Sequence, residues 1–198
     1  MGAITLLYDT CIVFALGCLL QMDAGRIHLA LLHLHSVVLV PHDKDEIQLI
    51  HPSFRDFMIQ WCPAGSRYFI NPVYHHQQLV LACFKTMHDC LKKDICGIRD
   101  MWKLNVEVED LDDRIATCIP AHLQYACRHW ATHLSEALSD AYFADDDVYD
   151  GLVLFMSLHF LHWLEVLSLT RQLAEALPAL RHAQDWASVS YICIECIR

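Results

Sequence analysis

The sequence has few of the residues that break helices. Six glycines and six prolines occur in 198 residues, about half of the combined frequency of roughly 12% in average proteins. A β-sandwich or a collagen-like chain would need many more of them, so both folds are disfavoured. Hydrophobic residues make up 55% of the chain, which is enough to form a core. The composition therefore predicts a mainly α protein with long helices.

Basic residues are also scarce. The chain has 14 Lys and Arg and 24 Asp and Glu, which gives a net charge of −10 with histidine neutral. No run of basic residues forms a stripe along the sequence. Phosphate backbones are bound through Lys and Arg, so we expect no nucleic-acid partner.

Long hydrophobic runs are missing as well. The apolar runs at 11–20 and 152–160 are shorter than the roughly 20 residues that span a bilayer, and Asp9 interrupts the apolar start. We therefore expect no membrane partner. The ten cysteines are irregularly spaced, which favours reduced, buried thiols in a cytoplasmic protein.

Residues 1–62 are predicted to form a small domain that begins with three short helices. The third helix starts at Asp23, and its apolar positions are expected to face the core. These positions are Leu29, Leu32, Leu34 and Val37.

A β-hairpin and a fourth helix are expected to complete this domain. The β-rich runs VVLVP (37–41) and IQLI (47–50) flank the charged turn HDKDE. Pro52, with Ser53 and Asp56 as a capping box, predicts the fourth helix. Three helices, a hairpin and a helix are the order of elements in a winged-helix domain, so we expect a winged-helix-like fold here.

Residues 63–72 are rich in turn residues and are predicted to be a linker to a helical domain at 73–198, which we expect to be an α-helical bundle. Residues 151–167 are apolar almost all round, with Glu165 as their only charge, so we expect the central, most buried helix there. Pro178 predicts a kink or a break in the next helix. Two further helices carry core residues at helical spacing: Leu79, Cys83, Met87 and Leu91, and then Leu123, Cys127, Trp130, Leu134 and Leu138.

Several blocks of the chain, in order, resemble one family. LLHLHSVVLVPHDKDEIQLIHPSFRDFMIQWC is similar to the segment that follows the nucleotide-binding core of fungal NACHT proteins, which are STAND-class signal-transduction NTPases. NPVYHHQQLVLACFKTMHDCLKKDICGI, IPAHLQYACRHWATHL and HFLHWLEVLSLTRQLAEALPAL resemble the helical region that comes next in those proteins. The resemblance covers residues 3 to about 186.

This resemblance implies a regulatory and interaction segment rather than an enzyme. The chain has no G-x-x-x-x-G-K-[ST] motif, so it lacks the loop and the lysine that hold a triphosphate. ADP or ATP is then expected only through a parent NACHT core, and the partners are expected to be proteins: that core, a repeat domain of the parent, or a second copy. By resemblance, His51 in LIHPSFRDF is the residue that reaches the β-phosphate of bound ADP in a full-length parent.

The same reading assigns residues around His51 to a core and to an interface. Leu49, Phe54 and Phe57 are expected in the domain core. Ile59, Trp61 and Tyr68 are the interface candidates.

A metal-binding or redox protein is the alternative function. His122, His129 and His133 lie within about 40° on a helical wheel, and His129 and His133 at i, i+4 could hold one Zn²⁺. Packing at the edge of the apolar face is the other interpretation. Cys193-x-x-Cys196 is the only CxxC, and it lacks a second pair or a βαβ context.

Other chemistry-bearing residues are expected to be structural. His159 and His162 are interpreted as core histidines, and His75 and His76 as surface residues in the first turn of a helix. No nucleophile motif is present, so no catalytic residue is assigned.

Overall fold

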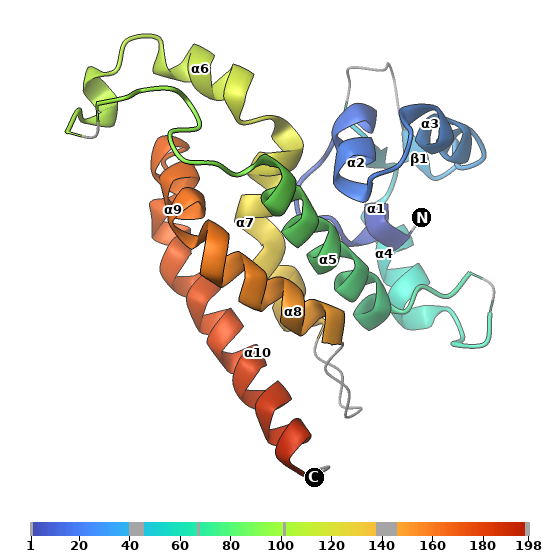
Figure 1. Cartoon of the computed structure of the whole chain (residues 1–198). Coiled ribbons are helices and arrows are strands. Elements are labelled where there is room, and N and C mark those ends of the chain that lie inside the picture. The colour runs from blue at the N-terminus through green and yellow to red at the C-terminus, as the bar shows by residue number, and fades with distance from the viewer. Residues whose placement is uncertain (1, 40–45, 67, 101, 138–145, 197–198) are drawn as a thin grey trace.

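The computed structural model describes residues 2–39, 46–66, 68–100, 102–137 and 146–196. These residues are mainly helical, with one two-stranded antiparallel sheet (Figure 1). The N-terminal elements are α1 (Gly2–Leu6), α2 (Val13–Leu20), α3 (Ala24–Leu32), β1 (Val38–Leu39), β2 (Gln48–Leu49), α4 (Pro52–Asp56) and the π-helical turn η1 (Phe57–Trp61). The remaining elements are α5 (Pro72–Cys90), the 3₁₀ turn η2 (Asn105–Glu107), α6 (Leu111–Cys118), α7 (Ala121–Glu136), α8 (Asp146–Leu154), the π-helical turn η3 (Phe155–His159), α9 (Phe160–Leu169), the 3₁₀ turn η4 (Leu173–Glu175) and α10 (Ala176–Cys196).

The expected order of three helices, a hairpin and a helix is present in the N-terminal part. Val38 pairs with Leu49 across the hairpin. The chain between α1 and α2 also joins the hairpin, because the backbone N–H of Ile47 donates to the carbonyl of Cys11 at 2.8 Å. The small sheet is therefore tied to the helices that precede it.

The core face of α3 differs from the expected one. Asp23 caps this helix, and its carboxylate accepts the backbone N–H of Gly25 at 2.9 Å. Leu29 and Leu32 are 59% and 55% exposed, whereas Ile27 and Leu31 are buried. Residues 27 and 31 are one turn apart and lie on the face toward α2, so the prediction for Leu29 and Leu32 was wrong. Leu34 and Val37 are partly buried against the core.

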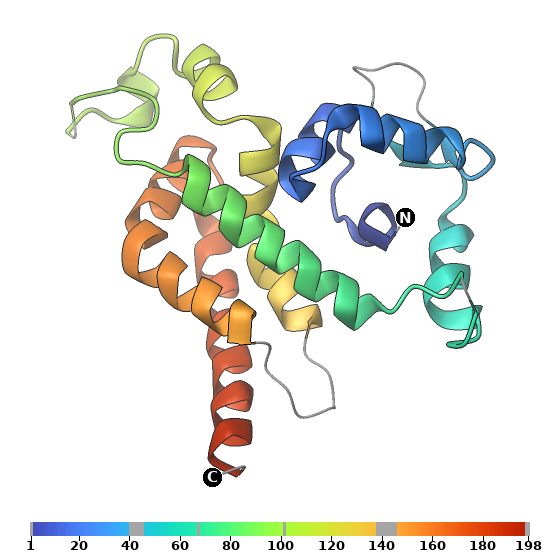
Figure 2. The same ribbon diagram turned by 45° about the vertical axis from the view of Figure 1, so that its right-hand side comes forward.

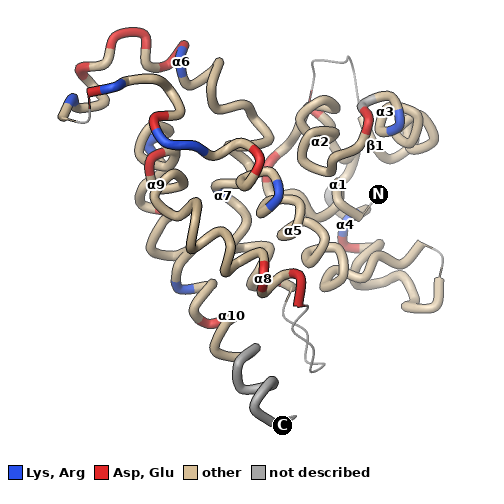
Figure 3. The backbone as a smooth tube through the Cα atoms, viewed as in Figure 1, with Lys and Arg blue, Asp and Glu red and all other residues tan. Residues whose placement is uncertain are grey.

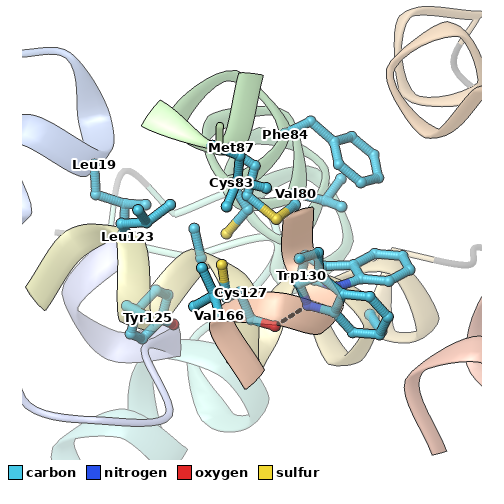
Figure 4. Packing of buried hydrophobic residues seen from close by; sticks show 14 of the residues in the cluster. Leu19, Val80, Cys83, Phe84, Met87, Leu123, Tyr125, Cys127, Trp130 and Val166 are labelled. Carbon is cyan, nitrogen blue, oxygen red and sulfur yellow. Dashed lines mark hydrogen bonds between the residues drawn. The ribbon is translucent and has the colours of Figure 1, made fainter. Parts of the chain in front are cut away.

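The centre of the molecule is the contact between α5 and α7, which lie side by side along most of their length (Figure 2). The predicted core positions on both helices are confirmed. Figure 4 shows several of these side chains meeting between the two helices. The buried residues are Leu79, Cys83, Met87, Leu123, Cys127, Trp130 and Leu134, together with Leu91 just after α5; Leu138 lies outside the described residues.

The apolar stretch of α8, η3 and α9 is not the most buried part, contrary to expectation. One face packs on the core through Phe155 and Trp163, and the Trp163 indole N–H donates to the carbonyl of Cys127 at 2.8 Å. The other face is open, and Leu158 and Leu161 are 55% and 73% exposed. Because α7 lies between α5 and α10, it is enclosed on more sides than α9. Among the described residues, Asp146–Leu169 is also long and apolar enough to cross a membrane by length and composition, and a core helix passes the same test.

Pro178 does not kink a helix. It lies in the first turn of α10, where a backbone N–H has no partner within the helix, so proline is tolerated there. The predicted break is therefore the start of a helix.

The buried core continues across the predicted domain boundary. Leu16 and Leu19 of α2 belong to the same hydrophobic cluster as Val80 of α5 and Trp130 of α7. The segment 63–72 does separate η1 from α5 as irregular chain, and the division into two domains stays a prediction.

Glu165, the single charge of the apolar stretch, has a structural partner. Its carboxylate oxygens accept the backbone N–H groups of Asp94 at 3.2 Å and Ile95 at 3.1 Å. These groups belong to the loop that follows α5. The only acidic residue of α9 thus anchors that loop to the helix. Figure 3 shows that acidic and basic residues are frequent along the segment between α5 and α6.

Replacing Glu165 with leucine should lower the free energy of unfolding by about 1–3 kcal/mol, because two backbone donors lose a charged acceptor. Urea denaturation measures this change. Glu109→Gln, at an exposed position, is the control and should stay within about 0.5 kcal/mol of the parent. Equal stability of Glu165→Leu and the parent would contradict the anchoring role.

Candidate functional site

His51 is exposed and caps the N-terminus of α4. Its Nδ1 accepts the backbone N–H of Ser53 at 3.1 Å and lies 2.6 Å from the Ser53 hydroxyl. The backbone N–H can only donate, so Nδ1 must be an acceptor, and the proton of the neutral ring is on Nε2. No hydrogen bond of Nε2 is present among the described residues. The ring thus offers one N–H donor to a neighbouring molecule.

The predicted capping box is wrong in detail. His51, two residues before Ser53, is the N-cap residue, and Pro52 occupies the first turn of α4 as expected. An imidazole nitrogen replaces the hydroxyl oxygen that a Ser-x-x-Asp pattern predicts.

The residues after α4 expose aromatic side chains. Trp61 is 77% and Tyr68 52% exposed, and Ile59 is partly buried against the second, smaller hydrophobic cluster. Phe57 was expected in the core and is 50% exposed. It opens the π-helical turn η1, whose wider spacing turns Met58 inward instead. Leu49 and Phe54 pack against the buried clusters as expected.

His51→Ala should remove the cap and lower the free energy of unfolding by about 1 kcal/mol. His51→Asn should retain most of the stability, because asparagine is a good N-cap residue that accepts through its side-chain oxygen. Urea denaturation of both variants checks this. A similar loss in both would show that the cap is not the contribution of His51.

Apart from His51, several histidines of α5 and α7 form a buried cluster with Tyr8 and Tyr125. The Nδ1 atoms of His76 and His133 are 2.8 Å apart, and the Tyr125 hydroxyl lies 2.7 Å from His133 Nε2. His133 has no exposed surface and His76 is 3% exposed. The Tyr8 ring stacks on His129, with centroids 5.5 Å apart.

The hydrogen-bond donors of this cluster indicate which ring nitrogens carry the protons. The backbone N–H of Tyr8 donates to the Tyr125 hydroxyl oxygen at 3.4 Å. Among the described residues, His133 Nε2 is the acceptor within reach of the Tyr125 O–H, so His133 carries its proton on Nδ1 and donates it to His76 Nδ1. The hydrogen bonds run in one direction from Tyr8, in the segment after α1, through α7 to α5. The cluster joins the N-terminal elements to the bundle.

Burial keeps both histidines neutral. It lowers the pKa of His76 to about 4, with Arg55 and His75 adding to the effect. Burial also lowers the pKa of His133 to about 3, with smaller effects from His76 and His129. A protonated ring would lose its role as acceptor and would be a buried charge.

The metal-ligand stripe His122, His129 and His133 lies on α7 as predicted, but nitrogens of His129 and His133 have other partners. Both ring nitrogens of His133 are used in the buried cluster. His129 Nε2 lies 2.6 Å from the Asp9 carboxylate, which also pairs with Arg128 at 3.1 Å. The three side chains do not converge on one point, and no group of three or more ligands does so among the described residues.

Sequence reasoning missed the burial of His76. It was placed on the surface because it lies in the first turn of α5 and is polar. Its spacing carried a signal: Leu79, Val80 and Cys83 follow it by three, four and seven residues, so they share its face of the helix. Tyr8 and Asp9 could not be assigned, since only the fold brings them to α7.

The cysteines behave as core residues. Burial raises the pKa of the Cys11 thiol to about 11, and it also raises the pKa values of Cys83 and Cys127. These thiols are therefore poor nucleophiles. The side chains of Cys193 and Cys196 lie outside those that the structure describes.

The buried histidine pair should make stability depend on pH. Unfolded imidazoles take up protons below about pH 6.5, whereas the folded chain does so only near pH 4 for His76 and pH 3 for His133. The free energy of unfolding should therefore fall between pH 6.5 and 4, by up to about 1.4 kcal/mol per pH unit for each histidine.

Urea denaturation of the parent and of a His76→Leu/His133→Leu variant between pH 7.5 and 4.5 measures this effect. The variant should have the smaller slope. His35→Leu, on an exposed histidine, should keep the parent slope. Identical slopes in all three proteins would refute the assignment.

The comparisons with known proteins add no relationship to this geometry. No protein-family model, no curated protein and no solved structure matches the chain. The resemblance to NACHT proteins therefore rests on the quoted residues.

Proposed function

We propose that this chain is a non-enzymatic regulatory and interaction segment of a NACHT-type STAND NTPase, with a winged-helix-like unit followed by a helical bundle. It transmits the nucleotide state of an ATPase core that is not part of this chain. In the ADP state the segment lies on that core, and it is released when the nucleotide changes. This is a two-state element biased by one ligand.

The geometry of His51 is the observation that carries the proposal. A residue that reaches a phosphate of a nucleotide on another domain must be exposed and must offer a donor. His51 is exposed, and the use of Nδ1 by the helix cap places the proton on Nε2. An exposed N–H without a partner among the described residues is the kind of donor from which a phosphate oxygen accepts.

The exposed aromatic residues near His51 support a protein partner. Trp61 and Tyr68 follow α4 in the same part of the fold. Tyrosine and tryptophan are enriched at protein interfaces, where they often dominate the binding energy. Docking of a core through these residues would place it on the N-terminal part of the fold, which also carries His51.

The test is binding of the full chain to the NACHT ATPase core encoded next to it, with ADP or with a non-hydrolysable ATP analogue. We expect tighter binding with ADP. His51→Asn, which keeps the cap, should weaken binding in ADP by about 10- to 100-fold, since a hydrogen bond to a charged group contributes about 1.5–3 kcal/mol. Equal binding in both nucleotides, or no adjacent frame with a Walker lysine, would contradict the proposal.

The aromatic contact has its own prediction. Trp61→Asp and Tyr68→Asp should each weaken binding to the core at least tenfold, because a charge would be buried in the interface. Trp102→Asp is the matched control: Trp102 is 93% exposed and lies in the segment between α5 and α6, far from α4 in both views (Figures 1 and 2).

ATP hydrolysis by the purified chain above buffer background would contradict the non-enzymatic role.

A further inference from the structure

A cavity of about 560 Å³ lies between the loop that follows α5 and the C-terminal end of α9. Pockets that bind small molecules usually have about 300–1,000 Å³. Its lining combines the apolar side chains of Ile98 and Leu169 with several charged groups. Neither His51 nor the buried histidine cluster borders it, so this cavity is separate from the sites described above.

The acidic residues of the cavity serve the fold of the loop. The Asp94 carboxylate accepts the backbone N–H of Arg99 through Oδ2 at 3.1 Å. Glu165 accepts the two backbone N–H groups already described, and Asp100 accepts the backbone N–H of Trp102 at 3.0 Å. Hydrogen bonds from N–H groups stabilise a carboxylate in its charged form. These three charges therefore have partners within the protein.

The basic residues of the cavity have no such partners. Lys93, Arg99 and Lys103 line it and are exposed. No hydrogen bond or ion pair of these three side chains is present in the part of the chain that the structure describes. Elsewhere in that part, cations do pair with carboxylates: Lys85, Arg128 and Arg171. Three cationic donor groups around one cavity are thus left for a ligand.

The loop that carries these cations is held in place before any ligand binds. Arg114 Nη1 donates to the carbonyl of Gly97 at 3.1 Å, and the Gly97 N–H donates to the carbonyl of Asp94 at 2.9 Å. Arg99 has a φ of 64°, in the left-handed region that a long side chain rarely adopts. Its N–H is fixed there by Asp94. A preformed wall favours binding, because little ordering is needed when the ligand arrives.

The local charge selects a small anion. Residues 92–105 carry four basic and two acidic side chains in a chain of net charge −10, and the basic ones are blue in Figure 3. The next segment, 107–113, carries five acidic residues. These acidic residues would repel an extended anionic partner such as a nucleic acid or a lipid surface. A small molecule that fits within the cavity avoids this repulsion.

We propose that this cavity binds a small, water-soluble organic phosphate. A phosphate ester carries about −1.5 to −2 charges at pH 7, and its oxygens accept from Lys93, Arg99 and Lys103. The planar guanidinium of Arg99 matches two phosphate oxygens at once. Ile98 and Leu169 contact the apolar part of the molecule. This inference is independent of the proposed regulatory function.

The test is calorimetric titration of the full chain with phenyl phosphate, whose phosphate and ring match the two parts of the cavity. We expect one molecule to bind per chain, and added salt should weaken binding because it screens exposed charges. Arg99→Gln should lower the affinity at least tenfold, since a bidentate contact is lost. Lys93→Gln and Lys103→Gln should each lower it by a smaller factor. Arg181→Gln, at an exposed position of α10, removes the same charge and should keep the parent affinity.

Comparison ligands separate the two parts of the molecule and its source. Inorganic phosphate should bind more weakly than phenyl phosphate, and phenol and vesicles that contain phosphatidic acid should not bind. Amide ¹H–¹⁵N spectra of the parent locate the site without any variant, because phenyl phosphate should shift signals of residues 93–105 and of Ser168. No binding of phenyl phosphate, binding of phenol or vesicles, equal affinity of Arg99→Gln and the parent, or shifts confined to other residues would each overturn the proposal.

Discussion

The contact between α5 and α7 is the constraint on which the rest of the structure depends. On both helices, apolar side chains that recur about every four residues pack against each other and form a common interface. Five other helices pack on one of these two, α1 and α2 from one end and α8, α9 and α10 from the other, whereas α3 packs on α2. The tight centre formed by Trp130, Phe155 and Trp163, in edge and tilted ring contacts, fixes where the outer helices lie.

Buried polar groups then decide how the outer elements join this centre. The one-directional chain from Tyr8 through Tyr125 and His133 to His76 crosses from α1 to both central helices. It can form only if both rings are neutral, which burial enforces. Glu165 also joins two elements, at the opposite end of the bundle, where its carboxylate accepts two backbone N–H groups of the loop after α5. Both links are specific because an unpaired polar group in the same place would be costly.

Much of this fold could be predicted from the spacing of apolar residues, and the errors share one cause. The core lines of α5 and α7 are correct because long helices with a strong period have only one buried face. Leu29 and Leu32 were misplaced because α3 is apolar on more than one side, so the sequence does not say which side meets α2. The stretch of α8 and α9 was expected at the centre for its composition, but the number of neighbours around a helix depends on topology, which composition does not encode.

The candidate site was partly within reach of the sequence. His51 could be singled out only through the resemblance, and its role as the N-cap of α4 could not be predicted, since histidine is not among the preferred N-cap residues. The cavity beside Glu165 joins Lys93 of the loop after α5 to Ser168 of α9. Local spacing cannot reveal such a cavity, because only the attachment of that loop to Glu165 brings the two segments together.

The cap and the proposed phosphate contact of His51 are linked through one ring. While Nδ1 accepts from the backbone of α4, the neutral imidazole must present its proton at Nε2, so folding of α4 prepares the donor. A ligand that accepts this proton in turn favours the tautomer that caps the helix. If the proposed contact forms, binding at Nε2 and the order of the first turn of α4 would therefore reinforce each other. Loss of the ligand would weaken the same turn that leads into η1 and the exposed Trp61.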